Sequence, residues 1–322
     1  MADLRQEICN YLKRKYDLTY HPENETLVTV GGSEAIDLAI RAIVNPGDEV
    51  LIVEPSFVCY KPIVELMHGM AIPISTQLKN KFKLTAEELC SHITERTKLL
   101  ILPYPNNPTG GIMTREDLEA IAEVLRDTNV LVLSDEIYSE LTYGRKHVSI
   151  ASIDGMWERT IYVSGFSKAF AMTGWRLGYV CAPEPIAKQM LKIHQYAIMS
   201  APTLSQYAAI VALRECDKEV QKMVDEYNRR RRMLVDGFNR IGLTCFNPEG
   251  AFYMFPCIRS IGMSSEEFCE TLLQEEKVAV VPGNAFGESG EGFVRVSYAY
   301  SLKHLQEALV RIERFVNRHR GE

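Results

Sequence analysis

One lysine in this chain stands where its amine could be withdrawn from water and used for chemistry. Lys168 lies in the run SGFSKAFAMTGWRLGY, among small and aromatic residues. Desolvation lowers the pKa of a lysine amine and favours Schiff-base formation with a carbonyl carbon. Because an isolated lysine is more often a surface charge, the residue is a candidate nucleophile that needs support from its surroundings.

A carboxylate ends one of the apolar runs and also needs a partner. Asp135 closes the run VLVLSD and is followed by EIY. Burial of a carboxylate at the end of an apolar strand is costly unless a cation or hydrogen-bond donors face it. The partner could be a structural arginine or lysine, or the protonated nitrogen of a ligand, and both alternatives stay open at this point.

Two loops have the composition of ligand-binding turns. The residues GGSE (31–34) follow LVTV and open a helical pattern, so their backbone could approach a phosphate at a helix start. A tight strand-to-helix turn with Ser33 as the N-cap is the simpler interpretation of these residues when they are taken alone. In YPNNPTGG (104–111) two prolines restrict the loop around Asn107. This loop could present one amide, or it could be an ordinary turn.

The elements that would position these residues alternate between strand and helix patterns. Helical periodicity at 35–44 and 115–126 lies between short apolar, β-branched runs. This alternation predicts an α/β fold with a mostly parallel, doubly wound sheet. In such sheets ligands collect beyond the carboxyl ends of the strands, where the polar residues above are found. The predicted strands are 27–30, 49–54, 98–103, 130–135, 160–164 and 177–182.

The pattern changes after Pro202. A long helical stretch without proline runs towards Ile241, and the mixed segments FYMF, VAVVP and FVRVSY follow before a closing helix from about Leu302. The sequence therefore predicts a large ligand-binding domain over 1–200. A connecting helix and a small C-terminal α+β domain are predicted over 201–322.

Composition argues against several classes of partner. The 322 residues are 46% hydrophobic, and 36 basic against 42 acidic residues give a formal net charge of −6. Without a basic surplus, nucleic acid is not an expected partner. The basic run at 229–232 is expected on the solvated face of an amphipathic helix. Eight cysteines without a C-x-x-C pair indicate thiols in a reducing cytoplasm, with no metal site and no membrane segment expected.

Taken together, the segments resemble a known family. In order they are VTVGGSEA, NPGDEV, PNNPTGG, SDEIYSEL, SGFSKAFAMTGWRLGY, PEGAFYMF and EGFVRVSYA. They are similar to the class I and II, fold-type-I aminotransferases that use pyridoxal 5'-phosphate, especially those related to aspartate aminotransferase. The resemblance implies a homodimer that moves an amino group between an L-amino acid, aspartate-like or aromatic, and a 2-oxo acid.

The resemblance also implies roles around the cofactor ring. Lys168 would hold the cofactor covalently and then act as the base for the substrate α-proton. Asp135 would pair with the protonated ring nitrogen. Asn107 and Tyr138 would hydrogen-bond the phenolate oxygen of the ring. Phe57 would stack on the ring face, although a core phenylalanine is the alternative.

The phosphate and the substrate carboxylate have their own candidates by the same resemblance. Arg176, eight residues after the lysine, would bind the phosphate together with Gly32, Ser33 and Glu34, and Ser167 is a weaker candidate. At the substrate, a bidentate fork would hold the α-carboxylate beside Asn107. That fork is expected from Arg295, whose alternative is an exposed strand charge.

The resemblance leaves some expectations about activity open. Relatives commonly begin well before the first residue here, with an arm and a loop that closes over the substrate. We therefore expect cofactor binding to be retained better than turnover. A different pyridoxal-phosphate reaction, such as C–S bond cleavage or decarboxylation, is one alternative. A cofactor-binding domain with weak catalysis is another.

Overall fold

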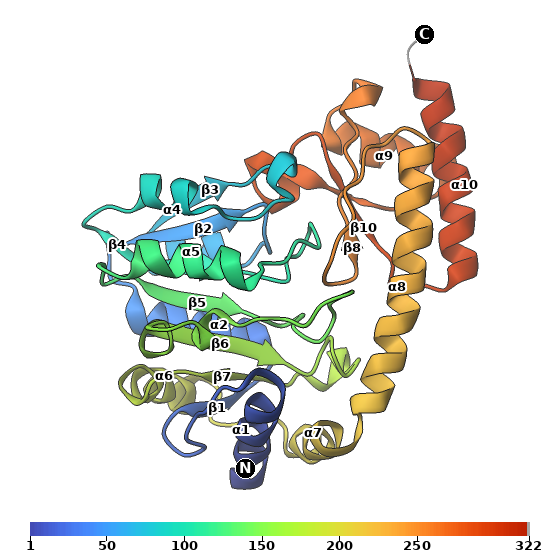
Figure 1. Cartoon of the computed structure of the whole chain (residues 1–322). Coiled ribbons are helices and arrows are strands. Elements are labelled where there is room, and N and C mark those ends of the chain that lie inside the picture. Colours follow the sequence, from blue (N-terminus) through green and yellow to red (C-terminus); the bar gives the residue numbers. More distant parts are fainter. Residues whose placement is uncertain (321–322) are drawn as a thin grey trace.

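The large lobe is built on a seven-stranded sheet in the order β1-β7-β6-β5-β4-β2-β3 (Figure 1). The computed structural model describes residues 1–320. In this sheet β7 runs antiparallel to its neighbours β1 and β6, and the other pairs are parallel. The strands are β1 (Thr26–Thr29), β2 (Glu49–Glu54), β3 (Met70–Ser75), β4 (Thr97–Leu102), β5 (Leu131–Asp135), β6 (Thr160–Gly165) and β7 (Gly178–Cys181).

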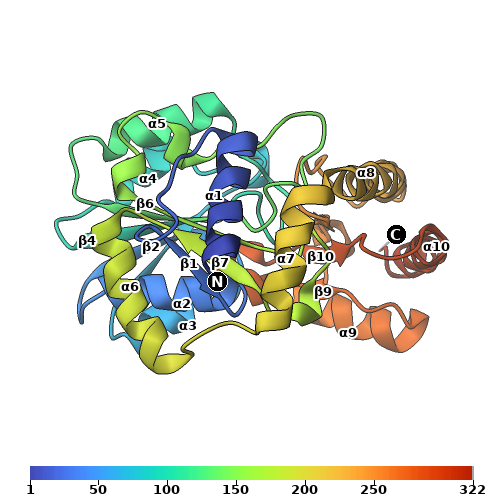
Figure 2. The same cartoon turned by 90° about the horizontal axis from the view of Figure 1, so that it is seen from below.

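Helices cover both faces of this sheet because successive strand residues point to opposite sides. In β6, Ile161 and Val163 pack towards α2 and α6, whereas Tyr162 packs on the other face with the core of α1 and α7. Figure 2 shows α2, α3 and α6 on one side and α1, α4 and α5 on the other. This arrangement confirms the predicted α/β fold. The helices are α1 (Ala2–Tyr16), α2 (Gly32–Ile43), α3 (Tyr60–Leu66), α4 (Ala86–His92), α5 (Arg115–Leu125), α6 (Glu184–Ala197) and α7 (Thr203–Glu215).

The small lobe is built on a second, antiparallel sheet in the order β8-β10-β9. Its core joins that sheet to three helices, and α8 and α10 lie side by side in Figure 1. Gly237 allows their close approach, since a Cβ there would lie 2.2 Å from a methyl carbon of Leu309. The elements are α8 (Asp217–Arg240), β8 (Tyr253–Met254), α9 (Ser265–Glu276), β9 (Val281–Pro282), β10 (Val294–Ser297) and α10 (Leu302–His319).

The expected long helix after Pro202 is wrong in one respect. It is two helices, α7 and α8, which meet at Cys216 and change direction there (Figure 1). The sequence offers no proline or glycine at this point, so helical periodicity alone could not show the bend. α7 packs against α1 of the large lobe, and α8 leads to the small sheet. The division at residue 200 is not tested by this packing and stays a prediction.

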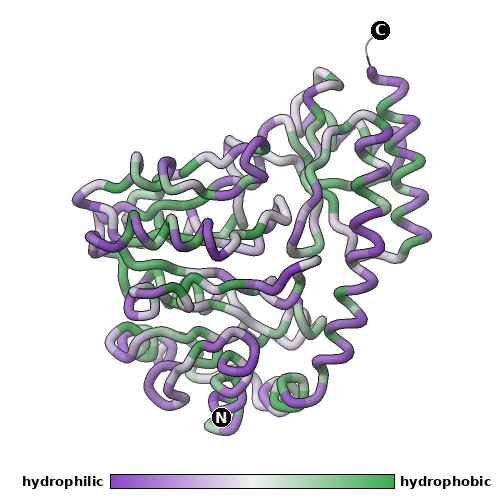
Figure 3. Tube along the Cα trace, viewed as in Figure 1, coloured by the Kyte–Doolittle hydropathy of each residue, from purple (hydrophilic) through white to green (hydrophobic). Residues whose placement is uncertain are grey.

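The basic run at 229–232 is only partly on a solvated face. Figure 3 shows α8 as a largely hydrophilic helix, yet Arg231 is 7% exposed. Its guanidinium donates to the carbonyl of Pro248 at 2.8 Å and to the Oδ1 atom of Asn228. Arg231 therefore ties α8 to the loop before β8, which is a structural use that the run of charges did not reveal.

Gly178 in β7 sets the distance between the sheet and the turn before α2. A Cβ at this position would lie 2.5 Å from the carbonyl carbon of Gly31 and 2.6 Å from the nitrogen of Gly32. We expect Gly178→Ala to lower the free energy of unfolding by about 1–3 kcal/mol, because backbone atoms must move to admit the methyl group. Urea denaturation of the two proteins measures this difference.

The matched control is Gly174→Ala. An added Cβ there meets no heavy atom of residues 1–320 within 4 Å, so the unfolding midpoint should stay near that of the parent chain. Equal stability of the Gly178 variant and the control would show that the contact between β7 and the turn is not tight.

Candidate active site

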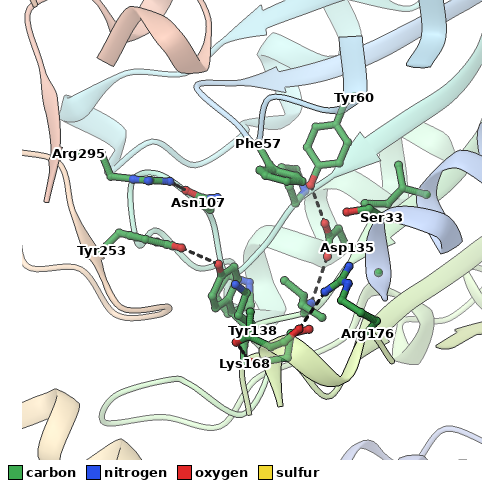
Figure 4. Close-up of a pocket in the computed structure, with 17 residues that line it drawn as sticks. Ser33, Phe57, Tyr60, Asn107, Asp135, Tyr138, Lys168, Arg176, Tyr253 and Arg295 are labelled. Carbon is green, nitrogen blue, oxygen red and sulfur yellow. Dashed lines mark hydrogen bonds between the residues drawn. The ribbon is translucent and has the colours of Figure 1, made fainter. Parts of the chain in front are cut away.

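A cavity of about 220 Å³ lies beyond the carboxyl ends of β5 and β6, between the two lobes. Asp135 and Lys168 line it from the large lobe, and Tyr253 and Arg295 line it from β8 and β10 of the small lobe (Figure 4). Of the eleven residues that the sequence singled out, ten line the cavity. The exception is Glu34. Parallel strands bring their carboxyl ends to one edge, which is why the large-lobe residues meet here although they are far apart in the sequence.

Asp135 is the last residue of β5 and is 6% exposed. Its Oδ2 atom accepts a hydrogen bond from the hydroxyl of Tyr60 at 2.7 Å, and its Oδ1 atom accepts one from the backbone N–H of Ile137 at 3.2 Å. Burial raises the pKa of Asp135 above its ordinary value, and the hydrogen bond from Tyr60 is the largest effect that opposes the rise. Both donors are neutral, so the carboxylate can still receive a cation from the cavity.

Lys168 follows β6 by three residues and points into the same cavity (Figure 4). Its Nζ atom lies 5.8 Å from the ring centroids of both Tyr138 and Phe252. Burial lowers the pKa of Lys168, the positive charges of Arg295 and Arg176 lower it further, and Asp135 opposes them. The environment therefore favours the neutral, nucleophilic amine.

One end of the cavity is suited to an anion. α2 begins at Gly32, directly after Gly31 with a positive φ of 81°, and the first N–H groups of a helix lack intrahelical partners. Arg176 lies against this turn, since a Cβ on Gly31 would be 2.7 Å from its Nη2 atom. Ser33 and Ser167 also line this part of the cavity. Neutral donors and a guanidinium thus converge where a phosphate could sit.

The side chain of Glu34 does not take part in that cluster. Its Oε1 atom lies 2.7 Å from the Nδ1 atom of His194 on α6, and its Oε2 atom accepts from the backbone N–H of Val30. The carboxylate therefore stabilises the packing of α2, as expected for an acidic group in the first turn of a helix. Only the backbone N–H of Glu34 remains as the predicted cofactor contact.

Arg295 in β10 is held by contacts on several sides. Its guanidinium carbon lies 4.6 Å from the ring centroid of Tyr253 and 4.8 Å from that of Phe286. Its Nη1 atom donates to the Oδ1 atom of Asn107 at 2.9 Å. Its buried Nε atom finds no acceptor within residues 1–320. A fixed guanidinium with an unused N–H is suited to a carboxylate ligand.

Two functional candidates were not found from the sequence. Tyr60 begins α3, three residues after Phe57, and the two rings meet edge to face at 6.0 Å. Tyr253 shares a buried hydrogen bond of 3.0 Å between its hydroxyl and that of Tyr138. Both belong to segments with recognisable patterns, EPSFVCY and PEGAFYMF. Nothing in those letters shows which aromatic ring faces the cavity and which enters the core.

The described residues contain no group of three or more His, Cys, Asp or Glu side chains arranged to hold a metal ion. In residues 1–320 no helix combines the length and the apolar character that crossing a membrane requires.

Comparison with known proteins places this geometry in a family. The family model described as aminotransferase class I and II matches residues 1–312. The putative aminotransferase YugH of Bacillus subtilis is 53% identical over 318 residues, which are 99% of this chain and 82% of that protein. Aspartate aminotransferase of Pyrococcus abyssi is 45% identical over 317 residues, 98% of this chain and 82% of that protein.

Solved structures agree with these matches. The aromatic aminotransferase of Pyrococcus horikoshii superposes with a TM-score of 0.97 at 43% identity, covering 99% of this chain and 86% of that chain. The chain therefore belongs to the class I and II aminotransferases, enzymes of fold type I that transfer amino groups with pyridoxal phosphate.

Proposed function

We propose that this protein binds pyridoxal phosphate at Lys168 and transfers an amino group between an L-amino acid, aspartate-like or aromatic, and a 2-oxo acid. The main support for this proposal is that Lys168, Asp135 and Arg295 line one cavity between the lobes. The substrate classes are supported by the names of relatives, which include aspartate and aromatic-amino-acid aminotransferases.

The residues present fit the parts of this cofactor. When bound, pyridoxal phosphate supplies an aldehyde for covalent attachment and a protonated ring that withdraws electrons. Asp135 offers a buried negative charge to the ring nitrogen, because its own donors are neutral. Phe57 and the hydroxyl of Tyr138 line the space in between, where they would contact the ring face and its oxygen.

The phosphate would be held at the start of α2. Backbone N–H groups of Gly32, Ser33 and Glu34 and the guanidinium of Arg176 supply donors of the kind that bind a phosphate dianion. The hydroxyls of Ser33 and Ser167 line the same region.

Substrate would bind at the opposite side, on Arg295. The bond to Asn107 and the two aromatic rings fix the guanidinium, so a carboxylate meets an already oriented fork. The amine of Lys168, whose pKa is lowered by burial and by the charges of Arg295 and Arg176, would then take the proton from the α-carbon and later return it.

Attachment of the cofactor should require Lys168 in its neutral form. We expect Lys168→Ala to lose the visible absorbance of the loaded protein and its fixation by borohydride. In the parent chain the rate of attachment should rise with pH around a midpoint below the ordinary lysine value of about 10.4, since the pKa of Lys168 is lowered. Stopped-flow absorbance from pH 6 to 11 measures this rate.

The control is Lys192→Ala, on an exposed face of α6, which should behave like the parent. A visible band that persists in Lys168→Ala would show that Lys168 does not hold the cofactor.

Tyr60 should matter because its hydrogen bond opposes the rise in the pKa of Asp135. In Tyr60→Phe the ring contact with Phe57 remains, but the pKa of Asp135 loses the largest effect that lowers it. We expect cofactor affinity to fall about tenfold at pH 7. The loss should grow as the pH falls, because a carboxyl with a raised pKa is protonated earlier. Equilibrium titration of the cofactor-free protein from pH 6 to 8 gives both quantities.

The control for that experiment is Tyr143→Phe. This hydroxyl is also buried and donates to the carbonyl of Ala251, but it does not line the cavity. The affinity of the Tyr143→Phe variant for the cofactor should equal that of the parent chain at every pH. If Tyr60→Phe binds the cofactor with the same pH dependence as the parent, the hydroxyl of Tyr60 does not influence the pKa of Asp135.

We further propose that the protein is a homodimer in the cytoplasm. Large apolar side chains are exposed on the connection between α6 and α7 and beside it: Trp175 48%, Tyr196 92%, Met199 77%, Leu204 80% and Tyr207 58% exposed. Ser205 donates to the carbonyl of Trp175 at 2.8 Å, which joins the two sides of this face. An apolar face of this kind is typical of a protein contact. The eight free cysteines support a reducing compartment.

Charge placed on this face should separate the two copies. We expect the double variant Met199→Glu, Tyr207→Glu to sediment as a monomer, because burying two carboxylates in an apolar contact is unfavourable. Leu66→Glu, a 66% exposed position on α3, is the matched control and should sediment like the parent. A monomeric parent chain at micromolar concentration would contradict the proposal.

A further inference from the structure

Tyr253 contacts two residues of the cavity that have different tasks. Its hydroxyl shares a 3.0 Å hydrogen bond with Tyr138, which follows β5 in the large lobe. Its ring lies 4.6 Å from the guanidinium carbon of Arg295 in β10. Figure 4 shows Tyr253 next to Tyr138 on one side and below Arg295 on the other. One side chain of β8 therefore connects the predicted cofactor contact with the predicted substrate contact.

We propose that Tyr253 is a positioning residue that turns the hydroxyl proton of Tyr138 towards the cofactor oxygen and holds the guanidinium of Arg295 in place. The inference rests on the roles proposed above for Tyr138 and Arg295. It assigns separate tasks to the hydroxyl and the ring of one residue, so the two can be tested separately.

The hydroxyl acts by fixing the direction of a shared hydrogen bond. Tyr138 is 4% and Tyr253 is 7% exposed. Burial raises the pKa of Tyr138 well above its ordinary value, so that hydroxyl keeps its proton. If Tyr138 donates to Tyr253, its only proton is used and cannot reach a ligand. If Tyr253 donates, the proton of Tyr138 stays available, and a hydroxyl that accepts a bond becomes a stronger donor.

A bond from Tyr138 to the cofactor oxygen requires the second arrangement. The geometry allows either hydroxyl to donate, and Tyr138 can direct its one proton into the cavity only when it accepts from Tyr253. The donor chain therefore runs from Tyr253 to Tyr138 and ends in the cavity, where the cofactor oxygen would accept. Both hydroxyls remain intact in this arrangement, and no proton leaves the pair.

The ring acts on Arg295 together with Phe286. The guanidinium lies close to both rings, at 4.6 Å and 4.8 Å from their centroids, and these contacts limit its rotation. The bond from Nη1 to Asn107 fixes the remaining freedom. The Nε–H group has no acceptor in residues 1–320, so it would remain available to a carboxylate ligand.

The test separates the two tasks by comparing Tyr253→Phe with Tyr253→Leu. Tyr253→Phe keeps the ring and removes the hydroxyl, so Tyr138 becomes a weaker donor to the phenolate oxygen. We expect the midpoint pH of the visible absorbance of the cofactor-loaded protein to rise by roughly half a pH unit. Tyr138→Phe should raise it more. Adding Tyr253→Phe to Tyr138→Phe should change nothing further, because the route through Tyr138 is already lost.

Steady-state kinetics give the second readout. With an amino acid that the parent chain transaminates, Tyr253→Phe should lower kcat with little change in KM. Tyr253→Leu should also raise KM, by roughly tenfold, because Arg295 loses one of its aromatic contacts. The control is Tyr298→Phe, a buried tyrosine of the small lobe whose hydroxyl donates to the carbonyl of Ala251. Its absorbance midpoint and KM should equal those of the parent.

Failure of this inference differs from failure of the proposed function. If Tyr253→Phe keeps the parent midpoint, or shifts it equally with and without the hydroxyl of Tyr138, the positioning role is wrong while cofactor binding stands. If Lys168→Ala retains the visible band, the proposed function itself is wrong. Urea denaturation of each cofactor-free variant identifies any protein whose altered midpoint reflects unfolding.

Discussion

The site depends on a negative charge kept at the buried end of β5. Burial raises the pKa of Asp135, and the bonds from Tyr60 and Ile137 oppose that rise. Without those donors the pKa of Asp135 would rise further, and a protonated ring nitrogen would have a weaker partner. The parallel strands place Lys168 opposite this charge, after β6, so the sheet itself sets the separation of the acid and the amine. The rest of the cavity extends from this pair: the anion site at α2 on one side and Arg295 on the other.

Both lobes are required because neither sheet alone carries all the charged groups. The large lobe supplies the carboxylate, the amine and the anion site, while β8 and β10 supply Tyr253 and Arg295. The small sheet has only three short strands, and its stability comes from the packing of α8 and α10 around it. This packing brings a guanidinium within hydrogen-bond distance of Asn107 in a loop of the other lobe. A contact across the lobes thus connects the orientation of Arg295 to the fold of the whole chain.

The sequence predicted what depends on strand ends and missed what depends on the direction of a side chain. Lys168 and Asp135 follow strong β patterns, and the shared edge of the large sheet brings them together, whereas Arg295, in a strand of the small sheet, was expected from the family resemblance. β3 was missed because MAIPIS lies at the edge of the sheet, contains Pro73 and is largely exposed. The carboxylate of Glu34 bonds His194 of α6 instead of a ligand, and only the packing of α6 on α2 determines that. The roles of Tyr60 and Tyr253 were missed for the same reason, because the sequence does not show in which direction an aromatic side chain points.

Basic side chains outnumber carboxylates in the cavity when no ligand is bound. Arg176, Arg295 and the amine of Lys168 face one carboxylate, and the two arginines lower the pKa of the lysine because their positive charges repel a third. A dianionic phosphate at α2 and a carboxylate at Arg295 would each relieve part of this repulsion. Binding therefore stabilises the folded chain by mass action, and it also changes the field at Lys168 in the direction that restores proton affinity. Both anions would thus raise the pKa of Lys168 from its lowered value in the free protein, so the amine would be a stronger base towards a bound substrate.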